Sequence, residues 1–425
     1  MKVSMPNVYM TIIISTLILK FGLDLLANRL NMKNLRGELP DEFINIFSVE
    51  EYRKSQHYIR IKTRFQLIFS VFNLIIIFTF WFLGGFNTID EMVRSWHLHM
   101  IFSGFFYISI LLLTHMILQL PFSAYETFVI EETFNFNKSK LSTFIQDTIK
   151  TLALAIFIGG FFVSLVSALF QYVGSLAWLY CWVAISFFSL INKYIIPTFI
   201  LPLFNKYNPI EEGELRISIV TYANYVGFSL ANIFVMDHSK RSTKLNAFLV
   251  GLGKRKRIVL FDNLIAKLSI PEIIAILAHE IGHYKKHHIL KSFIINIVRT
   301  GFALFLLSIF IRQEGLYQAF FMKNNSIYAG LVFFGLLYLP INYFISILLK
   351  IYCRHKEYAA DRYACKTIKN PQSLIDALKK MSLNNFSHLK PHSFYVFLNY
   401  SHPPILKRIN RIRTFINALP NLKPK

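Results

Sequence analysis

Residues 151–173, TLALAIFIGGFFVSLVSALFQYV, and residues 176–203, LAWLYCWVAISFFSLINKYIIPTFILPL, decide the class of fold. Each stretch is long and apolar enough to cross a bilayer as a helix, which takes about 20 residues. Only Gly174 and Ser175 separate them. The two stretches therefore predict a hairpin of two membrane-spanning helices.

Five further apolar stretches bring the predicted number of spans to seven. They are residues 8–28, 66–85, 98–119, 289–311 and 327–350. Of the 425 residues, 54% are hydrophobic and 16% charged, and the mean hydropathy is +0.44. Soluble domains average about 25% charged residues, so this composition excludes a soluble single-core enzyme. We predict an all-α polytopic membrane protein whose first span is an uncleaved anchor.

Basic residues outnumber acidic ones, with 46 Lys and Arg against 23 Asp and Glu and a formal charge of +23. They lie between and after the spans, and no nucleic-acid-binding motif accompanies them, so we expect no nucleic-acid partner. The basic segments follow span one, span five and span seven. The positive-inside rule places these segments on the cytoplasmic side of a bacterial inner membrane or the endoplasmic reticulum, with the N-terminus on the opposite side.

The spans divide the chain into four segments. Residues 1–203 hold the first five spans, and residues 289–350 hold the sixth and seventh. Residues 204–288 and 351–425 are the two cytoplasmic segments that are long enough to fold. We expect the chemistry of the protein to lie in these two segments.

Residues 204–288 contain several predicted elements. Residues 233–236 are typical of a short strand, and residues 247–252 and 258–261 predict a β-hairpin around the turn 253–256. The sequence Ser269-Ile270-Pro271-Glu272 has the form of a capping box with proline in the first turn. A helix should therefore begin at this point.

That helix contains the motif His279-Glu280-Ile281-Gly282-His283. Two histidines four residues apart lie on one helical face and suit two ligands of a tetrahedral zinc. Glu280 lies beside them, where it could take a proton from zinc-bound water. The alternative is a chance occurrence among 13 histidines, but the capped helix favours a site for one Zn²⁺ per chain.

A catalytic zinc needs a third protein ligand and an open position. Glu357 and Asp361 are also four residues apart, so Glu357 could bind the metal while Asp361 accepts a hydrogen bond from a ligand histidine. The alternative is a solvated carboxylate pair beside Lys356 and Arg362. His287 would lie one further turn along the same helix, too far to join the tetrahedron, and we assign it to the surface or an interface.

Two further features are candidates for contacts with substrate. His402, in Ser401-His402-Pro403-Pro404, could donate a hydrogen bond to a developing oxyanion, and Arg408 could orient a carboxylate or the site. On residue chemistry alone, this pattern is more typical of a capped turn before a basic helix. The strand 247–252 could hold an extended peptide along its edge.

The sequence resembles the type I CaaX prenyl endopeptidases, integral-membrane zinc metalloproteases of yeast and animals with bacterial relatives. The resemblance covers roughly residues 120–410 and includes the motifs above. The matching stretches are residues 125–132, 202–207, 213–215, 239–242, 246–247, 257–262, 279–283, 357–361 and 401–404.

The resemblance implies a fold and a set of metal-site residues. It implies a gluzincin-like zinc metalloprotease domain and seven helices around a water-filled chamber. His279, His283 and Glu357 match the family's zinc ligands, and Glu280 matches its catalytic glutamate. The segment between His283 and Glu357 is shorter than in yeast and animal members, and the Phe, Ile, Lys and Asn content is typical of an AT-rich genome, which favours a bacterial member.

The resemblance also implies residues that meet the substrate. His402 and Arg408 match a histidine and an arginine near substrate and metal, and Asn246 matches an asparagine of the substrate-binding strand. Family members remove the last three residues after a prenylated cysteine. The partners implied are the lipid bilayer and a peptide or protein substrate, which carries a prenyl group where such substrates exist.

We therefore expect a membrane zinc endopeptidase that cleaves C-terminal segments, prenylated CaaX tails where these exist. One alternative is a membrane quality-control zinc protease of broad specificity. Another is a non-enzymatic chamber or transporter with structural zinc, against which Glu280 argues because a structural site has no use for a base. The sequence leaves the oligomeric state open.

Overall fold

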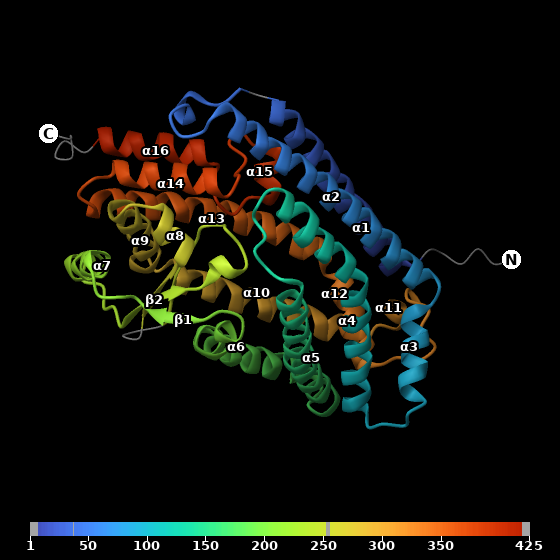
Figure 1. Cartoon of the computed structure of the whole chain (residues 1–425). Helices are drawn as coiled ribbons and strands as arrows, with labels where there is room; N and C mark the ends of the chain where they lie inside the picture. Colours follow the sequence, from blue (N-terminus) through green and yellow to red (C-terminus); the bar gives the residue numbers. More distant parts are fainter. Residues whose placement is uncertain (1–6, 37, 252–255, 419–425) are drawn as a thin grey trace.

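The computed structural model describes residues 7–36, 38–251 and 256–418, and most of them are helical (Figure 1). Among these residues, six helices are long and apolar enough to cross a membrane. They comprise α1 (Val8–Lys33), α2 (Val49–Phe82), α4 (Met100–Tyr125), α5 (Leu141–Tyr172), α6 (Ala177–Ile195) and α10 (His288–Phe310). A bent pair, α12 (Ile327–Leu337) and α13 (Leu339–Thr367), makes a seventh span if it is counted as one. The predicted class of fold is confirmed.

The last span is not the single straight helix that residues 327–350 predicted. Its two halves meet at Tyr338 with a bend of 51°. Pro340 lies in the first turn of α13, where a missing backbone N–H leaves no helical hydrogen bond unmade, so a new helix can begin there. Beyond residue 350 the second half continues as helix to Thr367.

Helix α2 begins much earlier than the predicted span 66–85. Ser48 caps it in a capping box with Glu51. Its 34 residues reach about 51 Å, whereas the hydrocarbon core of a bilayer is about 30 Å thick. Hydropathy detects only the apolar second half, because the first half is basic and extends beyond the membrane.

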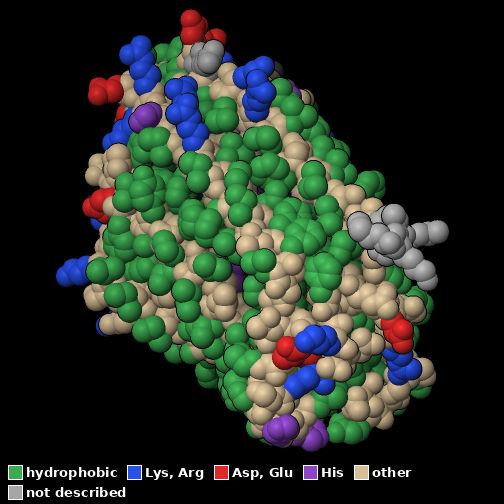
Figure 2. All heavy atoms as spheres, turned by 90° about the vertical axis from the view of Figure 1, so that its right-hand side faces the viewer, with side chains coloured by type: hydrophobic (Ala, Val, Ile, Leu, Met, Phe, Trp, Pro, Cys, Tyr) green, Lys and Arg blue, Asp and Glu red, His purple; other side chains and the backbone are tan. Residues whose placement is uncertain are grey.

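The surface has the character expected of a protein embedded in lipid. In Figure 2 hydrophobic side chains cover the middle of the visible face, and charged side chains gather mainly toward its ends. Large apolar side chains on the spans are exposed, such as Leu19 on α1 at 65% and Phe102 on α4 at 59%. In water such a continuous apolar surface would cause association, so the bilayer is its natural solvent.

Between the fifth and sixth spans in the sequence, the chain forms a small sheet. Its strands lie in the order β1 (Tyr207–Pro209), β2 (Asn232–Met236), β4 (Arg257–Phe261) and β3 (Ala247–Val250). Strands β2 and β4 are parallel, and the β3–β4 pair is antiparallel. The predicted strand 233–236 and the predicted hairpin are confirmed, whereas residues 252–255 of the hairpin turn lie outside the described residues. Strand β3 is an edge strand.

Shorter helices complete the chain. They are α3 (Gly85–Arg94), α7 (Glu214–Tyr225), α8 (Asp262–Lys267), α9 (Ile270–Lys285), α11 (Glu314–Gln318), α14 (Gln372–Asn384), α15 (Ser393–Asn399) and α16 (Ile405–Asn417). Helix α4 continues directly into a π-helical turn, Glu126–Glu131. Helices α9, α13, α14 and α16 lie together at one end of the molecule (Figure 1).

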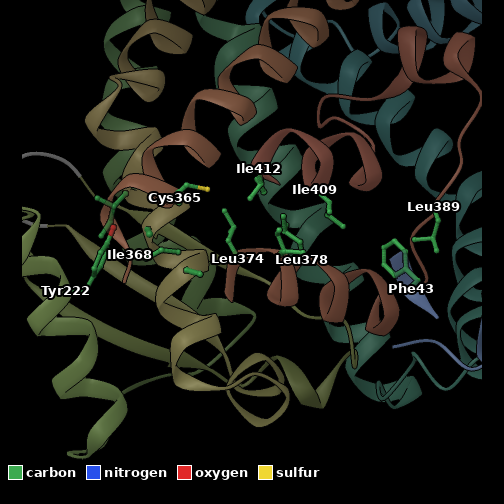
Figure 3. Close-up of a cluster of buried hydrophobic side chains, with 14 of the residues drawn as sticks. Phe43, Tyr222, Cys365, Ile368, Leu374, Leu378, Leu389, Ile409 and Ile412 are labelled. Carbon is green, nitrogen blue, oxygen red and sulfur yellow. The ribbon is translucent and has the colours of Figure 1, made fainter. Parts of the chain in front are cut away.

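A buried apolar cluster holds these four helices together (Figure 3). Ala278 and Ile281 of α9 and Cys365 of α13 belong to it, together with Leu374 of α14 and Ile409 of α16. Small residues on α9 and branched residues on its neighbours allow close packing at this point. The core therefore fixes α9 against α13, the two helices on which the candidate metal ligands lie.

Candidate metal centre

Helix α9 begins where the capping box predicted. The backbone N–H of Ser269 donates a hydrogen bond to Glu272 Oε2 at 2.7 Å, and Lys380 Nζ of α14 lies 2.8 Å from Glu272 Oε1. Both contacts hold the first turn in place. Two turns further on, His279 and His283 lie on one face of the helix, as their spacing requires.

The helix ends sooner than expected. It stops at Lys285, and His287 has a φ of +55°, so His287 caps the next helix and does not extend α9. His287 is exposed, but its neighbour His288 is buried with Nδ1 3.1 Å from His283 Nδ1. His288 is therefore part of the site, whereas the exposed His287 is not. The left-handed turn at His287 is what redirects the chain, and hydrophobic periodicity gives no sign of it.

Helix α13 brings Glu357 to the two histidines of α9. The His279 and His283 Nε2 atoms lie 3.1 Å apart. His279 Nε2 lies 3.4 Å from Glu357 Oε2, and His283 Nε2 lies 3.3 Å from Glu357 Oε1. Ligands at 2.0–2.1 Å from a tetrahedral zinc are about 3.3 Å from one another. The three groups therefore already have the spacing that one metal ion requires.

The donor chemistry also fits a metal. Glu357 is 5% exposed, and its Oε2 accepts no well-directed hydrogen bond from the described residues, although His402 Nδ1 lies 2.9 Å away. A buried carboxylate oxygen without such a donor is costly unless a cation satisfies it. Two imidazoles and one carboxylate leave the fourth position of a tetrahedron open, which is the arrangement of a catalytic site.

Asp361 and Arg408 support the histidine from the side away from Glu357. Asp361 Oδ1 lies 2.8 Å from His279 Nδ1, and Arg408 of α16 donates two hydrogen bonds to Asp361 at 2.6 and 2.9 Å. Burial by itself lowers the pKa of His279, but the Asp361 carboxylate outweighs it and raises the pKa to about 9. Burial likewise lowers the pKa of Arg408, and Asp361 more than reverses this. The guanidinium is therefore engaged with Asp361, as expected of a residue that orients a carboxylate or the site. Arg408 also lines the cavity beside the metal site, and its contact with substrate stays a prediction.

Glu280 and His402 lie where two cavities meet. One cavity of about 620 Å³ is lined by Asn246, Arg408 and residues of α14, and another of about 810 Å³ by residues of α6 and α10. Glu280 is half-buried, the His402 side chain is 68% exposed, and both line each cavity. The two side chains are thus accessible to a molecule that enters from either side.

Strand β3 connects the same two cavities. Asn246, just before the strand, is exposed and lines the first cavity, whereas Phe248 and Leu249 line the second. A peptide laid along the free edge of β3 would therefore pass the metal site. The structure brings together every residue that the sequence singled out for the site, and it adds His288.

Three comparisons with known proteins agree. Residues 28–206 match the family described as "CAAX prenyl protease N-terminal, five membrane helices", and residues 209–416 match "Peptidase family M48". The chain is 34% identical to the probable CAAX prenyl protease 1 of Schizosaccharomyces pombe, over 92% of this chain and 86% of that protein. It is 33% identical to CAAX prenyl protease 1 of Saccharomyces cerevisiae, over 96% of each. The crystal structure of S. mikatae Ste24p superposes with a TM-score of 0.89 at 32% identity, covering 96% of this chain and 99% of that one.

Proposed function

Since this chain belongs to the CAAX prenyl protease 1 family within peptidase family M48, and is therefore a membrane metalloendopeptidase, we propose that it uses one zinc ion to remove short C-terminal segments from prenylated CaaX proteins. The observation that carries the choice of substrate is the cavity of about 810 Å³, which joins the metal site to membrane helices α6 and α10. A substrate with a lipid on one residue could present that residue to the bilayer and its peptide to the metal.

We assign the metal to His279, His283 and Glu357. Their 3.1–3.4 Å spacing supports this assignment, and so does the buried carboxylate oxygen that lacks a well-directed donor. Zinc bound there would act as a Lewis acid toward water and toward the scissile carbonyl. Asp361 holds His279 with Nδ1 as the donor and Nε2 free to bind metal, and Arg408 holds Asp361.

The remaining steps depend on side chains of the chain itself. Glu280 takes a proton from the attacking water as the water oxygen bonds to the carbonyl carbon, and it passes this proton to the amide nitrogen as the C–N bond breaks. His402 donates a hydrogen bond to the carbonyl oxygen as negative charge develops on it. Asn246 and the free edge of β3 hold the peptide extended during both steps.

We further propose that the site lies on the cytoplasmic side of the membrane. Lysine and arginine residues are concentrated in the segments before α2's apolar half, around the sheet and after α13. The positive-inside rule assigns such segments to the cytoplasm. Prenylated proteins are made in that compartment, so this orientation agrees with the proposed substrate.

The proposal is tested by cleavage of a farnesylated CaaX peptide beside an identical peptide without the farnesyl group. Both are incubated with the purified protein in lipid, with and without a chelator, and with the Glu280→Gln variant. We expect prenyl-dependent cleavage that stops on chelation, returns with zinc and is absent from the variant. Bound zinc is measured in every sample, so a loss of activity can be separated from a loss of metal.

Two results would contradict the proposal. Equal cleavage of both peptides would indicate a membrane protease of broad specificity. Full activity of Glu280→Gln with zinc bound would exclude Glu280 as the base.

A further inference from the structure

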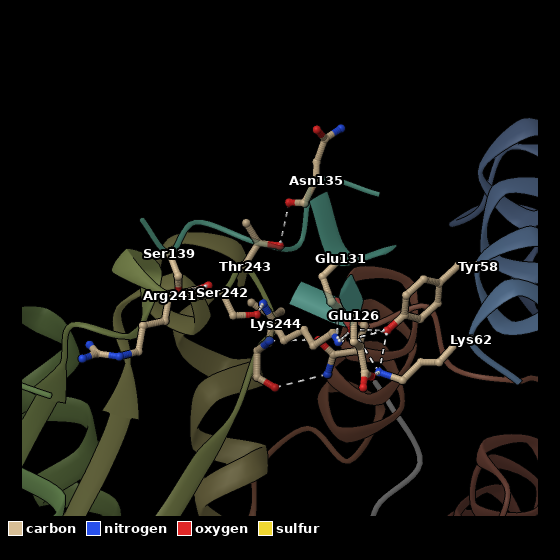
Figure 4. Close-up of polar contacts among 12 residues, drawn as sticks. Tyr58, Lys62, Glu126, Glu131, Asn135, Ser139, Arg241, Ser242, Thr243 and Lys244 are labelled. Atoms are coloured by element: carbon tan, nitrogen blue, oxygen red, sulfur yellow. Dashed lines mark hydrogen bonds and ion pairs between the residues drawn. The ribbon is translucent and has the colours of Figure 1, made fainter. Parts of the chain in front are cut away.

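The strand that we assign to substrate is attached to the membrane helices immediately before it begins. Strand β3 pairs with β4 along one edge only, so its position depends on what holds its two ends. Figure 4 shows the segment that precedes it, residues 241–244, against the end of the third span, where α4 passes into its π-helical turn. This attachment plays no part in the mechanism above.

The backbone of this segment is joined to the connection between α4 and α5. Lys138 N donates to Arg241 O at 3.0 Å, and Thr243 N donates to Phe136 O at 3.1 Å. Between these bonds, Asn137 and Ser242 form an isolated antiparallel bridge. A one-residue slip along such a ladder would turn each side chain to the opposite face, so side-chain contacts must select the register.

Lys244 supplies such a contact. Its Nζ lies 2.9 Å from Glu131 Oε2 and 3.0 Å from Glu131 Oε1, and the Glu131 side chain is only 15% exposed. Glu131 also accepts hydrogen bonds from Tyr58 at 2.7 Å and from Lys62 at 2.9 Å, both on α2. A single carboxylate therefore joins β3's leading segment to two membrane helices. Charge-assisted bonds with several donors are the strong kind.

The π-helical turn explains why Glu131 points in this direction. Lys62 Nζ contacts Glu126 Oε1 at 2.8 Å as well as Glu131, and these two glutamates are five residues apart. Five residues of an α-helix rotate a side chain by about 140° away from the first. In the π turn Glu126–Glu131, residues five apart share a face instead. The turn thus directs both carboxylates to Lys62 and leaves Glu131 free to reach Lys244.

The residue after Lys244 is fixed from the other side. Leu245 N donates to Asn385 Oδ1 at 2.9 Å, and Asn385 Nδ2 donates to Leu245 O at 3.2 Å. Asn385 lines the cavity of about 620 Å³ beside the metal site. The start of β3 therefore lies between the membrane helices on one side and the wall of the site on the other.

We propose that Lys244 and Glu131 are positioning residues that set the register of β3, and hence how tightly β3 holds the peptide beside the metal. This inference rests on the proposed function, because it takes β3 as the strand along which the peptide lies. Neither side chain lines the two cavities at the metal, so the pair acts through the strand and not on the reacting atoms.

The test compares Lys244→Met with Lys240→Met in the full-length protein in lipid. Lys240 lies four residues earlier, just before the segment 241–244, its side chain is 63% exposed, and its ammonium pairs with Asp237. We expect Lys244→Met to raise KM for the farnesylated peptide about tenfold with kcat changed by less than about twofold, as expected when an interaction that holds the bound peptide is lost. Bound zinc should be unchanged, and Lys240→Met should match the wild type.

Two further variants separate positioning from general stability. Lys244→Arg keeps the charge and should restore KM. In Glu131→Gln combined with Lys244→Met, the increase in KM should be smaller than the product of the two single increases, because each single change removes the Lys244–Glu131 contact. Amide hydrogen exchange at residues 246–250 should rise in Lys244→Met. This last measurement needs no substrate, so it tests the pair even if neither peptide is cleaved and the proposed function fails.

The inference is overturned if Lys244→Met and Lys240→Met have the same KM and the same exchange at β3. A fall in kcat with KM unchanged, or a loss of zinc, would also overturn it.

Discussion

A Cβ added to Gly282 would lie 3.1 Å from the carbonyl oxygen of Ala360, where α9 crosses α13. Gly282 lies between the two histidines of α9, and Ala360 lies between Glu357 and Asp361 of α13. The two helices therefore approach each other closely between the groups assigned to the metal. The short distances among the three candidate ligands depend on this approach.

Gly282→Ala should destabilise the protein and weaken metal binding, because the new methyl group meets backbone that cannot move without shifting α13. We expect a loss of about 1–3 kcal/mol, the usual range for an overpacked core. Thermal unfolding and bound zinc measure both effects. Gly22→Ala on α1 is the matched control, since its Cβ would meet nothing within 4 Å. Equal stability of the two variants would show that the crossing tolerates a methyl group.

Asp361→Asn should lower zinc affinity by about 10–100-fold, the usual effect of losing a carboxylate behind a ligand histidine. The amide keeps the shape of the side chain but removes the charge that holds His279 and Arg408. Competition with a chromophoric chelator measures the affinity. Asp376→Asn is the control, because Asp376 accepts a hydrogen bond from Gln372 on the surface of α14. Unchanged affinity in Asp361→Asn would remove Asp361 from the metal site.

Zinc affinity should increase with pH up to about 9. The pKa of His279 is raised to about 9 in the metal-free protein, so at neutral pH a proton must leave before zinc can bind. The stability of the metal-free fold depends on pH in the opposite direction. The protonated histidine stabilises that fold below the ordinary histidine pKa, and this contribution is lost as pH rises through about 9. Zinc titrations between pH 7 and 9 measure the slope. A flat profile would contradict the raised pKa.

His402→Gln should lower kcat by about 10²-fold, the usual cost of removing one donor to a developing oxyanion. Zinc should stay bound, because His402 contacts Glu357 from the open side of the site. His355→Gln on the exposed face of α13 should leave kcat unchanged. Steady-state kinetics on the farnesylated peptide compare the two. A change confined to KM would assign His402 to substrate binding in place of catalysis.

Much of the fold could be predicted because hydropathy and capping are local. The spans, the β-hairpin and the start of α9 at Ser269 all follow from residues that are close in sequence. The bend at Tyr338 and the polar half of α2 could not be predicted by hydropathy. A charged helix outside the bilayer has no apolar stretch, and a proline within an apolar run can continue a span or bend it.

In the candidate site too, the features that depend on local spacing could be predicted, and those that depend on tertiary packing could not. The spacing of His279 and His283 places both on one face of a helix, and the same argument applies to Glu357 and Asp361. Spacing suggested Glu357 as the third ligand and the family resemblance supported it, but the crossing of the two helices at Gly282 is a tertiary relationship that neither indicated. The pair of Asp361 with Arg408 depends on how α16 packs against α13, and the contact of His288 with His283 depends on the turn at His287. Local sequence patterns indicate neither the packing nor the turn. The bacterial source suggested by composition stays a prediction.

Helix α13 is unbroken from Leu339 to Thr367, about 43 Å at 1.5 Å per residue. Its first half belongs to a membrane span and its second half carries Glu357 and Asp361. A helix that long transmits tilt along its whole length, and spans tilt when the lipid around them becomes thinner or thicker. The geometry at Glu357 is therefore mechanically linked to hydrophobic mismatch, and we expect the rate of hydrolysis to depend on the acyl-chain length of the surrounding lipid.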